Sequence, residues 1–406
     1  MKNVFRFVLV IVILAAVACG GSNTNGPVIR DLTEVEQDLV QSSNVFGFKL
    51  LAEVVGESDG GNVFISPLSV SYALGMTYNG AAGSTEEGMR ETLQFGDLTR
   101  EEINQGYKDL MEMLCNLDPE VTMEIANSIW CREGFEVLQA FIDVNQTFFD
   151  AVVEVLDFAD PGAADVINAW VDEKTHGKIA KIVEPPISPT TVMFLINAIY
   201  FKGTWTTEFD PEKTTDATFH APDGDTPVQM MHLVTELPCL ETEDFRAVNM
   251  TYGDGLFSMT VILPKVDKDI DELIAEMENE KWATWAAGFF AQEADLYLPR
   301  FELEYEKSLN DVLAALGMGV AFTGAADFTG INPMGGLFIS NVKHKTYVKV
   351  NEEGTEAAAV TSVEIGYESE PLRFEMNVNR PFLFVIHDAH SNALLFMGKI
   401  VNPPSE

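Results

Sequence analysis

The sequence contains histidines, serines and carboxylates, but their spacing assembles no catalytic or metal-binding centre. No His-Glu-x-x-His or Gly-Lys-Ser/Thr motif occurs, and we expect no Gly-x-Ser-x-Gly nucleophile elbow. The six histidines are scattered, and His387 and His390 flank Asp388 in what reads as an exposed turn. A hydrolase using Ser66 or His344 would need a base and an orienting partner, for which the sequence offers no set. We therefore expect neither an enzyme nor a bound metal or cofactor.

One stretch near the C-terminus indicates a different kind of chemistry. It spans residues 351–371 and reads Asn-Glu-Glu-Gly-Thr-Glu-Ala-Ala-Ala-Val-Thr-Ser-Val-Glu-Ile-Gly-Tyr-Glu-Ser-Glu-Pro. Its alanines and Thr355 favour a helix start, whereas Val360 and Ile365 favour extended backbone. A strand-like run at residues 344–351 leads into it. The stretch is therefore predicted to adopt loop, helix or strand according to its surroundings.

Two motifs in this part of the chain resemble those of a known family. Residues 352–360 resemble the proximal hinge of the reactive-centre loop of serpins, and residues 376–386 resemble that family's C-terminal pattern. The motifs stand in the right order and spacing, and the resemblance covers nearly all of the chain from about Glu34 onward. It implies an α+β serpin fold with three β-sheets, about eight to nine helices and an exposed reactive-centre loop. Because no internal repeat or interior linker is visible, residues 34–406 are predicted to form one domain.

The resemblance implies a serine protease inhibitor that acts as a suicide substrate. In such proteins the target protease cleaves the loop and forms an acyl-enzyme, and the freed hinge inserts as a new strand into the central sheet. The trapped protease is carried across the molecule and its active site is distorted. A non-inhibitory serpin-fold protein with a binding or structural role is the alternative. The expected partner is a serine protease, and a cysteine protease stays open.

The hinge of the predicted loop is built from small and polar residues. By resemblance it consists of Glu352, Gly354, Thr355, Glu356, Ala357, Ala358 and Ala359. Thr355, Ala357 and Ala359 would face inward on insertion, into a core that has no room for larger side chains. Gly354 provides a turn point. This composition fits an inhibitory loop.

The position of the cleaved bond follows from the family's usual loop length. Counting from Glu352, the bond falls at Glu368-Ser369, and a protease with a basic specificity pocket that accepts Glu would be the target. The neighbouring bond, Tyr367-Glu368, would instead suit chymotrypsin-like or subtilisin-like enzymes. The sequence leaves both registers open.

Polar residues inside apolar runs mark a further part of the resemblance. Ser66 and Ser69 lie where a short strand is ended by proline and a helix follows, and Asn197 lies inside an apolar strand. Buried polar groups need hydrogen-bond partners, and taken alone these residues could be an N-cap and a satisfied core amide. The resemblance assigns them to a polar shutter beneath the main sheet, with a tryptophan at the sheet's upper opening: Ser66, Ser69, Asn197 and His344, and Trp205.

The amino terminus reads as an export signal. Two basic residues precede an apolar run at residues 7–17, which is too short for a permanent membrane span and ends at Ala-Val-Ala-Cys19. This resembles a bacterial lipoprotein signal, so residues 1–18 are predicted to be removed and Cys19 to carry the lipid. An ordinary secretory signal is the alternative. Residues 19–33 are predicted to be a flexible tether, and the chain is expected in the cell envelope, on the outer membrane, or secreted.

The composition limits the partners. The chain carries 63 acidic and 25 basic residues, a formal charge of −38, which argues against nucleic acid because phosphates require clustered Lys and Arg. Membrane contact is expected only through the lipid, and a monomer is expected. Cys115, Cys131 and Cys239 lack metal-binding spacing. We expect either one disulfide with a leftover thiol or three free thiols.

Hydrophobic periodicity predicts the elements that must position these residues. Helices are expected at residues 34–55, 165–176, 271–287 and 308–317. Strand patterns cover residues 121–130, 219–264 and 295–303. The apolar run at residues 191–201 is predicted to be a strand buried on both faces. The chain is predicted to close with a buried hairpin, residues 382–386 and 393–400, around a turn at residues 387–392.

Overall fold

Capping signals begin the first long helix where the sequence predicts it. Helix α1 spans Glu34–Gly56, and Thr33 is its N-cap. The Thr33 hydroxyl accepts the Glu36 N–H at 3.3 Å, and the Glu36 carboxylate accepts the Thr33 N–H at 2.7 Å. The helix predicted at residues 34–55 is thereby confirmed.

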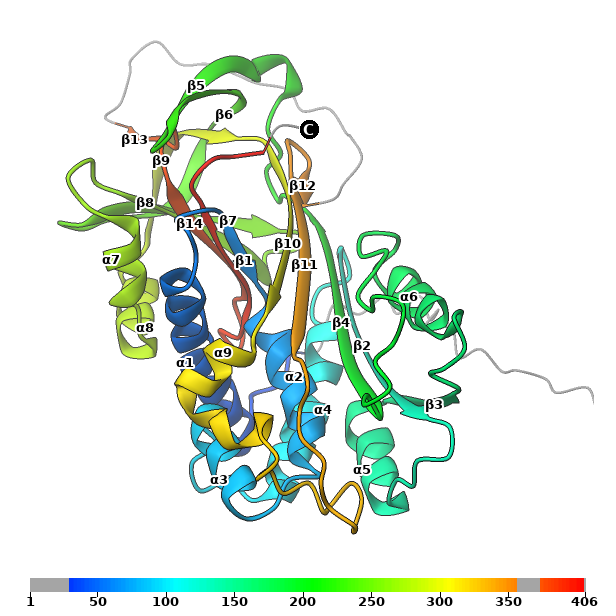
Figure 1. The fold of residues 1–406 in the computed structure, drawn as a ribbon. Helices are drawn as coiled ribbons and strands as arrows, with labels where there is room; N and C mark the ends of the chain where they lie inside the picture. Colours follow the sequence, from blue (N-terminus) through cyan, green and yellow to red (C-terminus); the bar gives the residue numbers. More distant parts are fainter. Residues whose placement is uncertain (1–28, 356–372, 405–406) are drawn as a thin grey trace, which may run out of the picture.

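The computed structural model describes residues 29–355 and 373–404 (Figure 1). Nine α-helices occur in these ranges, in agreement with the expected eight or nine. After α1 they are α2 (Pro67–Tyr78), α3 (Gly83–Thr92), α4 (Arg100–Cys115), α5 (Gln139–Phe149), α6 (Ala163–Lys174), α7 (Ile270–Ala275), α8 (Asn279–Gly288) and α9 (Asn310–Leu313). None of the helices described here is both long and apolar enough to cross a membrane.

Six strands form the sheet that carries Asn197, His344, Gly354 and Thr355 of the predicted shutter and hinge. Its order is β10-β11-β12-β4-β2-β3. The neighbours β2 and β4 pair antiparallel along nearly their whole length, which confirms the strand predicted at residues 121–130. The bounds are β2 (Val121–Arg132), β3 (Val152–Leu156), β4 (Met193–Thr204), β10 (Phe301–Ser308), β11 (Lys343–Val350) and β12 (Gly354–Thr355).

A second network of nine strands divides into two layers at the long strand β6 (Gly224–Glu241). β6 pairs with β7 only at its C-terminal end, and with β5 and β9 over the rest of its length. One layer therefore contains β1, β15, β14, β8 and β7, and the other contains β5, β6, β9 and β13. With the six-stranded sheet, these layers make the three sheets that the resemblance implies. The remaining bounds are β1 (Val63–Ile65), β5 (Thr215–Ala221), β7 (Phe245–Tyr252), β8 (Phe257–Pro264), β9 (Phe290–Pro299), β13 (Phe374–Asn377), β14 (Phe382–Asp388) and β15 (Leu394–Ile400).

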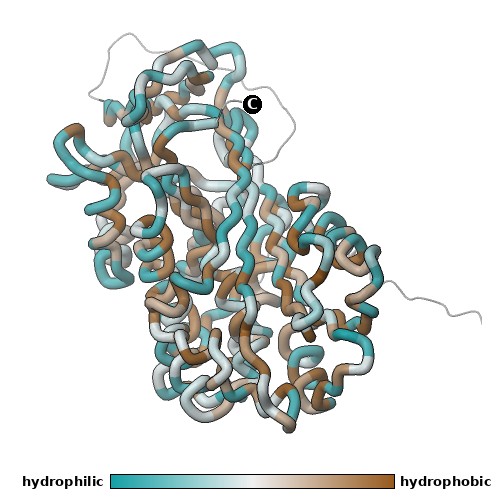
Figure 2. Tube along the Cα trace, viewed as in Figure 1, coloured by the Kyte–Doolittle hydropathy of each residue, from teal (hydrophilic) through white to brown (hydrophobic). Residues whose placement is uncertain are grey.

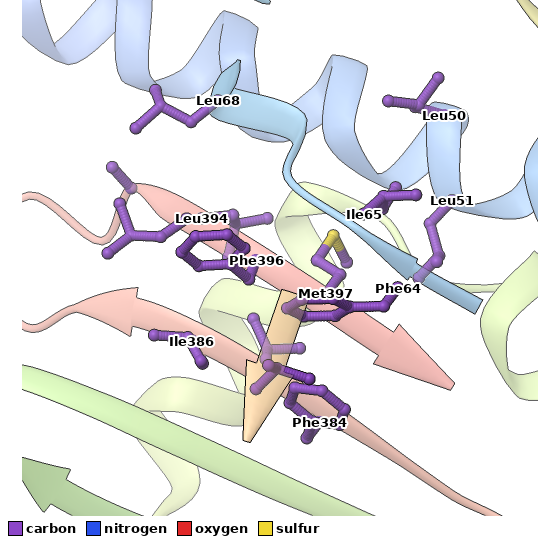
Figure 3. Packing of buried hydrophobic residues seen from close by; sticks show 14 of the residues in the cluster. Leu50, Leu51, Phe64, Ile65, Leu68, Phe384, Ile386, Leu394, Phe396 and Met397 are labelled. Atoms are coloured by element: carbon purple, nitrogen blue, oxygen red, sulfur yellow. The ribbon is translucent and has the colours of Figure 1, made fainter. Parts of the chain in front are cut away.

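The C-terminal hairpin lies inside the main apolar core (Figure 3). β14 and β15 are buried at every position and pair antiparallel, which confirms the predicted hairpin. Phe64 of β1 stacks on Phe384 and on Phe396, with ring centroids 5.5 Å apart in each pair. Figure 3 shows Leu50 and Leu68, from α1 and α2, on the helical side of these strands. The hairpin is thus covered by helices and joined to both neighbouring strands.

Two predicted elements differ from the structure. The single helix predicted at residues 271–287 is two helices, α7 and α8, because the chain bends at Met277 and buries that side chain in the core. The run at residues 191–201 is a strand, but the prediction that it is buried on both faces is wrong. Leu195, Asn197 and Ile199 are only partly buried, since one edge of β4 borders a cavity.

The predicted exposed turn is confirmed only beyond the end of β14. Residues 389–392 are exposed or half-buried, whereas His387 and Asp388 end the strand and are 7 % and 0 % exposed. The Asp388 carboxylate accepts the backbone N–H groups of His390 and Ala393, each at 3.0 Å. One side chain thereby satisfies the amides that such a turn would otherwise present to water. The turn pattern is visible in the sequence, whereas the hydrogen bonds of its acid to the turn amides are not.

Gly398 faces Phe384 across the hairpin and leaves no room for a side chain. A Cβ at Gly398 would lie 2.2 Å from the Phe384 ring. We predict that Gly398→Ala lowers the free energy of unfolding by about 1–3 kcal/mol through overpacking, measured by chemical denaturation. Gly56→Ala is the control, because a Cβ there meets no atom within 4 Å, and it should change stability little. An unchanged denaturation midpoint for Gly398→Ala would contradict the packing described.

Candidate functional site

The six-stranded sheet contains a slot between β4 and β11. Within the described ranges, these strands are joined only through β12, where Gly354 pairs with Thr204, and Thr355 pairs with Gly203 and with Val350. Figure 1 shows β4 and β11 separating below this point. A cavity of about 580 Å³ lies there, lined by both strands and by α2. The sheet therefore has room for a further strand between its two halves.

Close backbone contact fixes the residue at the mouth of the slot. A Cβ on Gly354 would lie 2.1 Å from the Gly203 carbonyl oxygen, so only glycine allows β12 to approach β4 in this way. The next residue, Thr355, is 3 % exposed, and its hydroxyl is 2.8 Å from the hydroxyl of Tyr252. Thr355 therefore points into the core.

Trp205 holds the turn that leads into β12. Its ring stacks on Tyr252 with centroids 4.3 Å apart and is buried. The Trp205 backbone N–H donates to the Glu353 carbonyl at 2.8 Å, and its indole N–H donates to the Asn351 carbonyl at 2.9 Å. The backbone and the side chain of Trp205 thus together tie the turn at residues 351–353 to the top of the sheet.

Glu352 is a buried carboxylate at the same turn. It forms an ion pair with Arg300 and accepts a hydrogen bond from the Thr214 hydroxyl. Burial acts to raise the pKa of Glu352, but the hydrogen bonds from Arg300 and Thr214 outweigh it, and the pKa is lowered overall. The carboxylate therefore stays charged and anchors the turn that leads into β12.

Ser66 and His344 meet beneath the slot, although not as a catalytic pair. The Ser66 backbone N–H donates to His344 Nε2 at 3.0 Å, while the Ser66 hydroxyl donates to the Leu395 carbonyl at 2.7 Å. Ser66 Oγ also accepts the Ser69 N–H at 3.2 Å as the N-cap of α2, and the Ser69 side chain lines the cavity. Because Nε2 accepts, the neutral ring carries its proton on Nδ1. Burial lowers the pKa of His344 to about 4.

Asn197 faces the slot from β4, the strand that lies across the slot from β11 and His344. Its Nδ2 donates to Asn127 Oδ1 at 2.9 Å, and Asn127 in turn donates to the Phe149 carbonyl at 2.7 Å. Asn197 Oδ1 is buried and accepts no hydrogen bond from the described residues. Sequence reasoning missed Asn127, and the only available signal was the matching position of two asparagines in paired strands. The slot is thus lined by an acceptor on β4 and by His344 on β11.

The connection between α6 and β4, residues 175–192, crosses the outer side of the slot. The His176 ring packs on Tyr200 of β4 with centroids 4.2 Å apart. Lys178 places its ammonium 4.8 Å from the Tyr347 ring of β11. Ile179 and Val183 are buried and line the cavity between these contacts. The connection therefore spans both banks of the slot.

The described residues around this slot form no nucleophile centre. The letters Gly-Glu-Ser-Asp-Gly do occur at residues 56–60, so the expectation that the pattern is absent is wrong as a reading of the sequence. They follow a helix rather than a strand, and the Ser58 hydroxyl donates to the Val55 carbonyl at 2.7 Å, so they form no elbow. No cluster of metal-binding side chains occurs among the residues placed by the structure.

The remaining predicted site residues can be placed only in part. Glu356, Ala357, Ala358, Ala359, Tyr367, Glu368, Ser369 and Cys19 lie outside the described residues. The other three cysteines are free thiols, in keeping with one of the two expectations. Burial raises the pKa of Cys115 and of Cys131 to about 11, so these thiols stay protonated at neutral pH.

Comparison with known proteins identifies the family. A model of the serpin family, described as serine protease inhibitor, matches residues 41–403. The chain belongs to the serpin family. It is 31 % identical to human Serpin B11 over 390 residues, covering 90 % of this chain and 99 % of that protein. It is 34 % identical to Iripin-5 of the tick Ixodes ricinus, covering 90 % and 95 %. An uncharacterized serpin-like protein of Thermococcus kodakarensis is also 34 % identical, covering 91 % and 86 %.

Solved serpin structures share the fold. Tengpin, a thermophilic serpin in its native state, superimposes with a TM-score of 0.83 at 32 % identity, covering 92 % of this chain and 95 % of tengpin. Human thyroxine-binding globulin, solved with thyroxine, gives a TM-score of 0.84 at 30 % identity, covering 91 % and 100 %. The serpin fold is thereby confirmed, and family membership supports protease inhibition as the general function. The thyroxine complex shows that this fold also carries ligand binding, so inhibition must be argued from the slot and the hinge.

The buried histidine predicts sensitivity of this serpin to acid. In the unfolded chain His344 takes up a proton near pH 6.5, whereas the folded protein resists protonation until about pH 4. The contribution of His344 to the free energy of unfolding is therefore fully present above pH 6.5 and is lost as the pH falls from 6.5 to 4. At pH 5 the loss from this residue is about 2 kcal/mol. His387, whose pKa burial also lowers to about 4, adds a similar loss. Urea unfolding at neutral and mildly acidic pH measures the sum.

Two variants isolate the contribution of His344. His344→Gln should lose less stability than the parent between neutral and acidic pH, because its side chain does not titrate. His220→Gln is the control, since His220 is exposed and its ring lies 2.8 Å from Asp225 at the surface. It should keep the parent's acid response. An unchanged acid response in His344→Gln would contradict the role assigned to the buried ring.

Proposed function

We propose that this serpin inhibits a serine protease as a suicide substrate, by inserting its cleaved loop between β4 and β11. The observation that carries the proposal is β12. Gly354 and Thr355, the start of the hinge, already occupy the mouth of the slot and pair with both banks. Below them the cavity continues between two strands whose facing edges lack a common partner in the described ranges. Insertion would extend an existing strand and would need no new site.

The register of β12 supports the same reading. β12 runs antiparallel to both neighbours, so each step forward along the loop corresponds to one step back on β4 and on β11. Counted along β4, the residue opposite Asn197 is Thr361, and counted along β11, the residue opposite His344 is again Thr361. An inward threonine hydroxyl could donate to Asn197 Oδ1 and accept from His344 Nδ1. The two polar residues of the slot would thus receive one complementary side chain.

The alternation of side chains fits the shape of the slot. Thr355 faces inward, so Ala357, Ala359 and Thr361 would follow on the inner face, and all are small. Each inserted residue would satisfy its own backbone groups and those of the flanking strands. This gain in hydrogen bonding and burial is available only after cleavage frees the loop at one end. The free-energy difference between the uncleaved molecule and the cleaved, loop-inserted molecule is therefore the driving force for trapping.

The covalent step can be written for the predicted bond. The protease hydroxyl attacks the backbone carbonyl carbon of Glu368 and gives up its proton. The bond to the Ser369 nitrogen breaks, and that nitrogen takes up the proton and leaves as a new amino terminus. An ester then links Glu368 to the protease until water hydrolyses it. Insertion must outrun this hydrolysis to hold the complex. Glu368 favours a protease that accepts Glu, and cleavage at Tyr367-Glu368 would favour a chymotrypsin-like or subtilisin-like enzyme. The same scheme holds for a cysteine protease thiolate.

Incubation with a protease panel tests the inhibitor. We expect a 1:1 complex stable in denaturant on gels, with release of a peptide starting at Ser369 seen by intact mass. Thr355→Arg should remain cleavable but form no complex, because an arginine would have to enter the buried site beside Tyr252. Thr355→Ser, which keeps the hydroxyl, should still trap. Trapping by Thr355→Arg would overturn the insertion mechanism. Cleavage of the parent without any complex, and without a gain in thermal stability, would indicate a non-inhibitory serpin.

We also propose that the chain is exported as a monomeric lipoprotein. The support is the sequence alone: the apolar run before Cys19 and the polar residues after it. Expressed in a bacterium that processes lipoproteins, the mature chain should begin at Cys19, carry acyl chains by mass, and partition into detergent. Cys19→Ala should abolish the acylation and move the protein to the aqueous phase. A parent protein that is cleaved elsewhere and partitions into water would leave ordinary secretion instead.

A further inference from the structure

Two lysines flank the mouth of the slot on its outer face. Gly203 of β4 and Val350 of β11 lie opposite Thr355, and all three residues are buried. The next position on each bank, Lys202 on β4 and Lys349 on β11, therefore projects to the opposite, outer side of the sheet. Lys202 is exposed and the Lys349 side chain is partly exposed. The two ammonium groups thus border the path that a strand extending β12 would take.

The loop residue that reaches this level first is a carboxylate. Glu356 follows Thr355 in the sequence, and the alternation of a strand places it outward, between Lys202 and Lys349. We propose that these lysines are positioning residues, a clamp that receives Glu356 when the loop inserts and holds the new strand in the register that Gly354 and Thr355 already set. The proposal rests on the insertion proposed above and concerns how it is guided.

The charges across the sheet would alternate once the clamp is filled. Glu302 of β10 already pairs with Lys349 at 3.3 Å. With Glu356 in place, the row across four strands would read Glu302, Lys349, Glu356, Lys202. Isolated surface ion pairs contribute little, whereas networks of several charges contribute more. Glu356 therefore completes a row of which the other three residues are present before insertion.

The distribution of charge in the chain agrees with this pairing. The chain has a net charge of −38, and residues 351–372 contain no lysine or arginine. Figure 2 shows that hydrophilic residues dominate the strands β10 and β11 next to the slot. The lysines of β11 are Lys343, Lys345 and Lys349, in a chain that has 25 basic residues in all. Each of these lysines already pairs with a glutamate of β10, so an acidic loop would meet a row of partly compensated lysines.

A clamp at this position would matter because the first residues set the register. A slip of one residue turns every side chain to the other face of the sheet. Glu356 would then have to enter the buried site that Thr355 occupies beside Tyr252, which costs much more than leaving it in water. The attraction of Glu356 to the lysines on the outer face and the cost of burying Glu356 on the inner face favour the same register. Together they keep the register that β12 sets until Thr361 reaches Asn197 and His344.

Charge-swap variants test the clamp. The measurements are the number of inhibitor molecules consumed per protease trapped, and the gain in thermal stability after loop cleavage. Lys202→Glu and Glu356→Lys should each raise the number of inhibitor molecules consumed per protease trapped about two- to fivefold. High salt should reduce the difference between each variant and the parent. The double variant Lys202→Glu with Glu356→Lys should recover at least half of the loss. Lys345→Gln is the control, because the register places it opposite the uncharged Val360, and it should behave as the parent.

The outcomes separate the clamp from the insertion itself. A parent that neither traps a protease nor gains stability on cleavage overturns insertion, and the clamp with it. A parent that traps, with single effects that merely add in the double variant, overturns the clamp alone. Lys202 also acts on Glu353, so rescue of Lys202→Glu by Glu353→Gln rather than by Glu356→Lys would assign Lys202 to the turn and overturn the clamp. Melting of each uncleaved variant, with Lys202→Gln as a milder change, shows that the fold is kept.

Discussion

The facing edges of β4 and β11 carry backbone groups that another strand can pair, and this unmet pairing is the constraint on which the structure depends. Within the described residues, that strand exists only as β12, at the mouth of the slot. Unpaired strand edges are costly or reactive unless they are covered, and here the α6–β4 connection and α2 enclose them. The molecule thus keeps a sheet that is stable enough to persist and incomplete enough to accept one more strand.

The polar residues beneath the slot reflect the same incompleteness. Ser66 is fully engaged, with its hydroxyl, its N–H and its role as N-cap all used. Asn197 is engaged on one side only, through Asn127. A partly satisfied buried network costs free energy and usually marks a functional demand. Here the missing donor lies where a new strand would pass, so the cost is borne by the uncleaved state and would be relieved by insertion.

The sequence predicted the parts of the site that depend on local chemistry. Ser66 before proline is an N-cap signal, and the hinge is recognisable from glycine and alanines next to threonine. It did not predict features that depend on what packs against an element. Met277 looks like one more apolar residue in a helix, yet its burial divides the helix into α7 and α8. Likewise, nothing in the run at residues 191–201 shows that one edge of the strand borders a cavity rather than a neighbour.

The shared fold cannot by itself decide between inhibition and ligand binding, since one serpin of similar structure was solved with thyroxine. The decision lies in the few residues that must enter the sheet. Glycine is the only residue type that fits at position 354 against the Gly203 carbonyl, and the Thr355 side chain is small enough to lie in the core beside Tyr252. Both residues are constrained in the uncleaved molecule, because β12 is already paired with β4 and β11. A loop that continued β12 into the slot would extend a strand that the fold already holds, and this is the physical reason to read the chain as an inhibitor.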